Sequence, residues 1–193
     1  KIRYQNLNIN NHNARGLFTT SRNRAAAQKI IAGSKHIDYN IFGTRTGRLS
    51  TYPGSFPMLT MPKDLRALVK PHNDWFISLD YNGAEARTVL GLLDKHQPPG
   101  DVHEWNVANV FANKGIGDRE AAKTFFFSWL YNPDSTKIEE SFYDRDALLE
   151  QYYKDGHIRT IFDRNIEVDE YKAVNYIVQS TTADLVNDRA VAL

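Results

Sequence analysis

The order of strand and helix signals along this chain is mixed, and its main feature is a hairpin signal followed by several helices. Residues 65–69 and 75–79 are rich in aliphatic and aromatic side chains, and the turn-forming segment 71–74 separates them. This pattern predicts a β-hairpin whose second strand leads directly into Asp80. From residue 84 onward the chain consists mainly of segments with helical periodicity. Strands followed by helices predict an α+β fold and argue against a doubly wound sheet, in which the two would alternate.

Capping and breaking residues predict where the helices begin and end. Asp101 and Asp118 are typical N-cap residues. Pro133 ends the helix that follows Asp118, because proline clashes with the preceding turn. The predicted helices are residues 21–31, 84–93, 102–111, 119–131, 139–154 and 170–191, with further strands at 39–42 and 158–162.

The charge of the chain is balanced in total and uneven along its length. Residues 1–70 contain 12 Lys and Arg against two acidic residues, whereas residues 71–193 contain 12 against 21. This asymmetry is typical of a protein that holds a polyanion with one part and metal ions with another, although surface charge can also cluster by chance. Cysteine is absent, which excludes a disulfide framework and a zinc–thiolate site. No apolar run reaches the roughly 20 residues of a membrane span, so we expect a soluble intracellular chain without a membrane partner.

Asp80 is the first candidate for chemistry. A predicted strand ends at this carboxylate, immediately before a bend and a helix that contains Glu85. A hard oxygen ligand on a rigid element suits Mg²⁺. The alternative is that Asp80 caps the following helix, a position that Asp favours.

The predicted helix 119–131 presents a second candidate. Arg119, Lys123, Phe127 and Tyr131 are four residues apart and therefore share one face of the helix. Two cations near a helix N-terminus would bind a triphosphate, and a ring further along would stack on a base. His103, on the preceding predicted helix, could add a phosphate contact. The alternative is a solvated basic edge beside aromatic core packing.

A third candidate lies on the last predicted helix. Asn175 and Gln179 are one turn apart, and amide side chains can donate hydrogen bonds to acceptors in the DNA minor groove. The alternative is that both are ordinary exposed polar residues.

Taken together, these segments resemble the family A DNA polymerases, the group of bacterial polymerase I and related phage replicative enzymes. The resemblance covers about residues 40–193, and its motifs follow the order of the family. They are Thr46-Gly47-Arg48-Leu49-Ser50, the Asp80-Tyr81-Asn82-Gly83-Ala84-Glu85-Ala86-Arg87 segment, Asp101-Val102-His103, the Arg119, Lys123, Phe127 and Tyr131 set, and Asn175 and Gln179 followed by Thr182-Ala183-Asp184.

The resemblance implies a role for each matching residue. It implies that the Asp80 carboxylate and the Tyr81 carbonyl bind the catalytic metals, and that Glu85 rejects a ribose 2′-hydroxyl. Arg119, Lys123 and His103 would hold the triphosphate, with Lys123 a candidate proton donor. Phe127 and Tyr131 would pack on the incoming base and the template, and Arg48, Asn175 and Gln179 would read the duplex minor groove.

The implied activity is template-directed DNA synthesis from dNTPs on primer–template DNA by two-metal phosphoryl transfer with two Mg²⁺ ions. The implied architecture is a polymerase palm of antiparallel strands with packed helices, plus helical fingers. Its expected parts are a thumb remnant or irregular segment at 1–40, palm at 41–95, fingers at 96–168 and a palm helix at 169–193. The expected location is the cytoplasm of a bacterial cell, or of a host cell for a phage or viral enzyme.

The sequence also departs from the family pattern. Asn82-Gly83 stands where many relatives have Ser-Gln, and Asn132 stands where they have Gly. The third catalytic motif, with the second metal-binding carboxylate, is not found in these residues, so we expect this fragment to be inactive alone. A single-subunit RNA polymerase relative and a non-catalytic nucleic-acid-binding module of the same fold are the alternatives; Glu85 argues against the RNA polymerase.

Overall fold

The computed structural model describes residues 6–10, 12, 14–17, 19–134, 138 and 142–192. Within this part the protein is a mixed α+β structure with three small antiparallel sheets. The chain divides into two compact units, Lys1–Leu79 and Asp80–Leu193, each with its own hydrophobic core. None of the described helices combines the length and apolarity that a membrane span requires.

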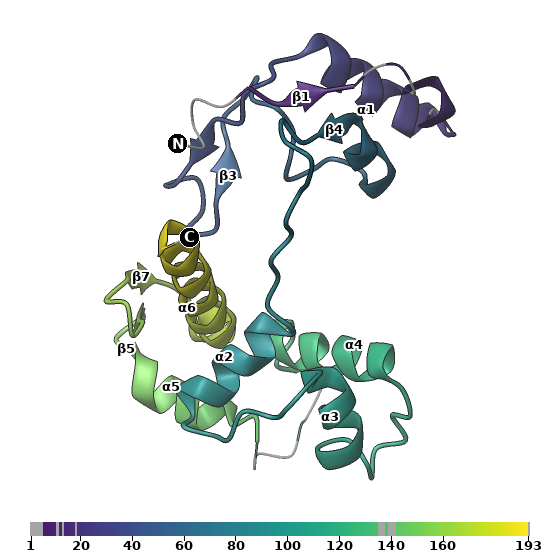
Figure 1. Ribbon diagram of the computed structural model, residues 1–193. Helices are drawn as coiled ribbons and strands as arrows, with labels where there is room; N and C mark the ends of the chain where they lie inside the picture. Colours follow the sequence, from purple (N-terminus) through teal and green to yellow (C-terminus); the bar gives the residue numbers. More distant parts are fainter. Residues whose placement is uncertain are drawn as a thin grey trace. The chain divides into compact units, whose positions relative to one another are not determined.

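The first unit is built from short elements around one helix (Figure 1). The side chain of Thr20 accepts a hydrogen bond from the backbone N–H of Asn23 and caps the start of α1. The helix ends at Gly33, as predicted. Its buried face packs with Phe56 and Leu65 in the core of this unit. The elements are β1 (Asn8–Ile9), η2 (Ala14–Leu17), α1 (Ser21–Ala32), β2 (Tyr39–Asn40), β3 (Ser50–Thr51), η3 (Lys63–Leu68) and β4 (Val69–Lys70).

The predicted hairpin between residues 65–69 and 75–79 is wrong. Residues 63–68 form η3, and β4 pairs antiparallel with β1, with Ile9 opposite Val69. Among the described residues, segment 75–79 forms no strand, and Trp75 and Ile77 are more than four-fifths exposed. The partner of β4 therefore comes from the start of the chain, which a local pattern around the 71–74 turn could not indicate.

The second unit is mainly helical (Figure 1). Within it α3 packs on α4, and α6 packs against α2, α5 and the small sheet. Its elements are α2 (Ala84–Leu92), α3 (Val102–Asn109), α4 (Arg119–Tyr131), α5 (Arg145–Tyr152), β5 (Tyr153–Lys154), β6 (His157–Arg159), β7 (Asn165–Glu167) and α6 (Glu170–Ala192).

Most helices of the second unit have the predicted ends. Asp101, Asp118 and Asp144 each accept backbone N–H groups of the first helical turn. The predicted helix 139–154 is shorter, because α5 begins after Asp144 and the chain turns into β5 at Tyr153; residues 139–141 lie outside the described part. The strands β5 and β6 meet at Asp155-Gly156, both with positive φ, as a two-residue hairpin turn requires.

Candidate functional site

The Asn82–Gly83 turn, which follows Asp80 and is called the Asp80 turn below, is fixed against α3. Asp80 is exposed and does not cap α2, whose N-cap is Gly83, so the capping alternative is wrong. Gly83 has a φ of 59°, and a Cβ built on it would lie 2.1 Å from Cγ1 of Val102. Only glycine fits this position, because the conformation is left-handed and α3 leaves no room for a side chain.

Asn82 joins the same turn to α3 through its side chain. Its Oδ1 accepts the Val102 backbone N–H at 3.0 Å, and its Nδ2 donates to Oδ2 of Asp101 at 2.6 Å. The residues that depart from the family pattern, Asn82 and Gly83, are therefore the two that dock this turn on α3.

Asp101 connects this turn to α4. Its Oδ1 accepts the N–H groups of His103 and Glu104, and its Oδ2 accepts Nε of Arg119 at 2.9 Å and Nη2 at 2.8 Å. Partial burial by itself raises the pKa of Asp101, but hydrogen bonds from Arg119, Asn82 and these two amides lower it well below its usual range. Asp101 is thus a carboxylate at neutral pH, and Asn82, Asp101 and Arg119 form one continuous network.

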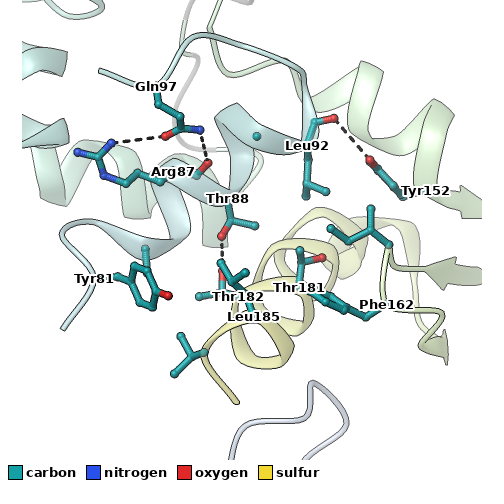
Figure 2. A pocket seen from close by; sticks show the side chains of 14 residues that line it. Tyr81, Arg87, Thr88, Leu92, Gln97, Tyr152, Phe162, Thr181, Thr182 and Leu185 are labelled. Atoms are coloured by element: carbon teal, nitrogen blue, oxygen red, sulfur yellow. Dashed lines mark hydrogen bonds between the residues drawn. The ribbon is translucent and has the colours of Figure 1, made fainter. Parts of the chain in front are cut away.

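Arg87 fastens the loop before α3. Its guanidinium donates to the carbonyl oxygens of Asn82 at 2.9 Å, Pro98 at 3.0 Å and Gly100 at 2.5 Å. The Gln97 side chain donates back to the Arg87 carbonyl, as Figure 2 shows. The start of α2 and the residue before Asp101 are therefore held together by one side chain.

The cation-and-ring stripe of α4 forms as predicted. Arg119, Lys123 and Phe127 are partly exposed and Tyr131 is exposed, while Phe126 and Trp129 face the core. The rings of Phe127 and Tyr131 stack at 5.9 Å with 18° between their planes. Among the described residues, the Lys123 side chain makes no hydrogen bond or ion pair. One face of α4 thus runs from two cations to two rings.

His103 lies beneath this stripe. It is 2% exposed, and its ring lies 6.1 Å from Phe126 and 6.3 Å from Phe127. No hydrogen-bond partner for its Nδ1 is found in the described part of the chain. Burial lowers the pKa of His103, which keeps the ring neutral at pH 7. Contact between His103 and a phosphate stays a prediction.

The far end of the stripe meets α6. Nε2 of Gln179 donates to the Tyr131 hydroxyl at 3.2 Å and to Oδ1 of Asn175 at 2.5 Å. Tyr171 at the start of α6 donates to Asn132 at 3.1 Å. The structure therefore brings together the residues predicted to bind a base and those predicted to read DNA.

The remaining predicted site residues occupy different positions. Glu85 is partly exposed in the first turn of α2. Arg48 is exposed in the loop between β2 and β3, and it belongs to the first unit, whereas every other predicted site residue belongs to the second.

A cavity of about 400 Å³ opens beside the Asp80 turn. It lies between α2 and α6, and Figure 2 shows Thr88 and Thr182 joined across it by a 2.8 Å hydrogen bond. Tyr81, Phe162 and Leu185 also line it, and its surface is mostly apolar. None of the residues that line it belongs to α4, so this cavity is separate from the α4 stripe. A mostly apolar lining also does not suit a triphosphate.

Metal ligands are incomplete in the part of the chain that is described. No group of three or more His, Asp and Glu side chains in it could hold a metal ion. Asp80 and the Tyr81 carbonyl are hard oxygen donors of the kind that Mg²⁺ prefers, and Mg²⁺ usually keeps water or phosphate oxygens in addition. These two donors alone would leave most positions around a Mg²⁺ ion to water or to the oxygens of a bound ligand.

Sequence reasoning missed the roles of Asn82, Asp101 and Arg87 in assembling the site. The sequence predicts Asp101 as an N-cap, but nothing in the neighbouring residues indicates that its second oxygen binds Asn82 and Arg119. Comparison with known proteins found no match to a protein-family model and none to a curated protein.

Proposed function

We propose that this chain is the nucleotide-binding part of a DNA-directed DNA polymerase similar to family A. It would hold a deoxynucleoside triphosphate between the Asp80 turn and the stripe of α4. The observation that supports this most strongly is the Asn82–Asp101–Arg119 network, because it joins a carboxylate-bearing turn to a cationic helix face within one compact unit.

The chemistry of the two ends of the stripe supports the same function. Arg119 and Lys123 lie in the first turns of α4, where the helix dipole also favours anions. Phe127 and Tyr131 lie one and two helical turns beyond Lys123, and their stacked rings offer a surface on which a base could stack. A triphosphate and a base could therefore be bound along a single helix.

The residues have distinct roles in this proposal. Arg119 and Lys123 neutralise the triphosphate, and Lys123 donates a proton to the leaving pyrophosphate oxygen. Asp80 and the Tyr81 carbonyl would hold magnesium, which would supply charge stabilisation of the departing oxygen. Glu85 excludes the 2′-hydroxyl. Arg48, Asn175 and Gln179 contact the primer–template duplex, in the palm-and-fingers arrangement that the resemblance implies.

The test is binding of dTTP with Mg²⁺ to the 193-residue chain, measured by calorimetry. Lys123→Ala is expected to weaken binding about tenfold, because one charge-assisted contact is lost. Lys154→Ala removes a charge of the same sign on β5 and is expected to leave the Kd unchanged. If both variants weakened dTTP binding equally, the binding would come from general charge attraction, which would contradict the proposal.

A further inference from the structure

We propose that Asp101 is a positioning residue that holds Arg119 in place for the triphosphate. This inference rests on the proposed function and extends it to a residue that is not itself expected to touch the nucleotide. Its basis is the way both oxygens of Asp101 are used.

Both oxygens of the Asp101 carboxylate are already engaged in hydrogen bonds, which hold the side chain in one orientation. Five N–H groups reach its two oxygens: two backbone amides at the start of α3, one from Asn82 and two from Arg119. The side chain is 17% exposed. To release Arg119, the carboxylate would have to uncap α3 and free the Asn82 turn together, so Asp101 is a fixed anchor.

Arg119 is held along one edge and remains accessible along another. Nε and Nη2 point to Asp101, and Nη1 donates to Glu120 at 2.5 Å. A guanidinium has five N–H groups, so not all of them are used by these two acceptors. The Arg119 side chain is 37% exposed, which leaves part of it open to an anion on the same face as Lys123.

Two roles for Asp101 predict opposite effects of removing its charge. If Asp101 competes with the phosphates for Arg119, its neutralisation strengthens triphosphate binding. If it positions Arg119, neutralisation weakens binding, even though the local charge becomes more positive, because a free arginine must be ordered when the nucleotide binds. The saturated, mostly buried carboxylate favours positioning.

The informative variant is Asp101→Asn. Asparagine is a good N-cap, so α3 keeps its first turn, but a neutral amide cannot replace the charged anchor of Arg119 and Asn82. We expect dTTP binding in the presence of Mg²⁺ to weaken about tenfold, as for loss of one charge-assisted contact. Thermal unfolding of the variant checks that the fold persists.

Glu120→Gln is the matched control. Glu120 also pairs with Arg119, but its side chain is 75% exposed, and such surface pairs contribute little. We expect this variant to bind dTTP as tightly as the unaltered chain, or slightly more tightly.

A double-mutant cycle separates positioning from a general structural role. If Asp101 acts through Arg119, then Asp101→Asn causes no further loss once Arg119 is replaced by Ala. Independent, additive losses would contradict the inference, as would unchanged or tighter binding by Asp101→Asn alone. In either case an effect of Lys123→Ala would leave the proposed function standing. Absence of dTTP binding by the unaltered chain would overturn both.

Discussion

A single oxygen of Asp101 accepts two hydrogen bonds from Arg119, at 2.9 Å from Nε and 2.8 Å from Nη2. The same oxygen accepts the Asn82 side chain, and the other oxygen caps α3. One carboxylate therefore fixes the relative position of a turn, a helix start and a cation. These contacts tie the Asn82 turn, the start of α3 and the first residue of α4 to one another.

Gly83→Ala should disrupt the docking of the Asp80 turn on α3. The new Cβ would lie 2.1 Å from Val102 at a positive φ, so we expect a loss of at least about 2 kcal/mol in the free energy of unfolding. Gly156→Ala is the control, since φ there is 78° and none of the described atoms lies within 4 Å of the added Cβ. Its cost should be about 1 kcal/mol. Urea unfolding measures both, and equal losses would contradict the steric argument.

His103 should make the second unit sensitive to acid. Burial lowers its pKa in the folded state, so below about pH 6.5 the unfolded chain binds a proton that the folded chain does not. The free energy of unfolding therefore keeps its full value above the pKa that His103 has in the unfolded chain, and it falls as the pH decreases below that pKa. His103→Gln is expected to flatten this part of the stability profile, measured by urea unfolding between pH 5 and 7.5. The same measurement on His157→Gln, which removes an exposed histidine of β6, is the comparison, and an equal change of slope in both variants would contradict the burial argument.

Tyr143→Phe should lower the free energy of unfolding by about 1 to 2 kcal/mol. The Tyr143 hydroxyl donates to the buried Asn106 Oδ1 at 2.8 Å, and without the hydroxyl that oxygen has lost this hydrogen bond. Burial raises the pKa of Tyr143 to about 12. The contribution of Tyr143 to the free energy of unfolding is therefore fully present below about pH 10, and it is lost as the pH rises toward 12. Tyr171→Phe, which loses an exposed hydrogen bond to Asn132, should cost less than about 0.5 kcal/mol. Chemical unfolding at pH 7.5 and pH 10.5 tests both points.

Asp184 should matter more for stability than Asp163, although both pair with arginine. Arg164 donates to both oxygens of Asp184, at 3.0 and 2.5 Å, and the Asp184 side chain is 16% exposed. Asp184→Asn is expected to cost about 1 to 2 kcal/mol. The side chains of Arg159 and Asp163 are each 75% exposed, so Asp163→Asn should lower the free energy of unfolding by less than about 0.5 kcal/mol. Thermal unfolding distinguishes the two, and similar costs would sink the burial argument.

Glu85→Ala should reduce discrimination between sugars if the proposed function holds. We expect the ratio of the Kd values for ribo- and deoxyribonucleoside triphosphates to fall about tenfold, because the group that excludes the 2′-hydroxyl is gone. Glu150→Ala on α5 removes an equal charge elsewhere and should leave the ratio unchanged. An unaltered ratio in Glu85→Ala would count against the assignment of this role to Glu85 and against the proposed function.

Local signals predicted the helices well because capping is local. Asp118 lies at the first turn of α4, and the four-residue spacing of the stripe follows from the helix repeat alone. The hairpin failed because strand pairing is not local: the partner of β4 is β1, which lies about sixty residues earlier in the chain.

The sequence alone determined where most helices begin, and it predicted two candidate features for chemistry: the carboxylate of Asp80 and the cations and rings on one face of α4. Only the tertiary structure decided that the turn after Asp80 is joined to Arg119 on α4, through the second oxygen of Asp101 and the space that Gly83 leaves for Val102. The reason is physical: capping and helical spacing act within a few residues, whereas a carboxylate selects its distant hydrogen-bond donors only when packing has brought the helices together.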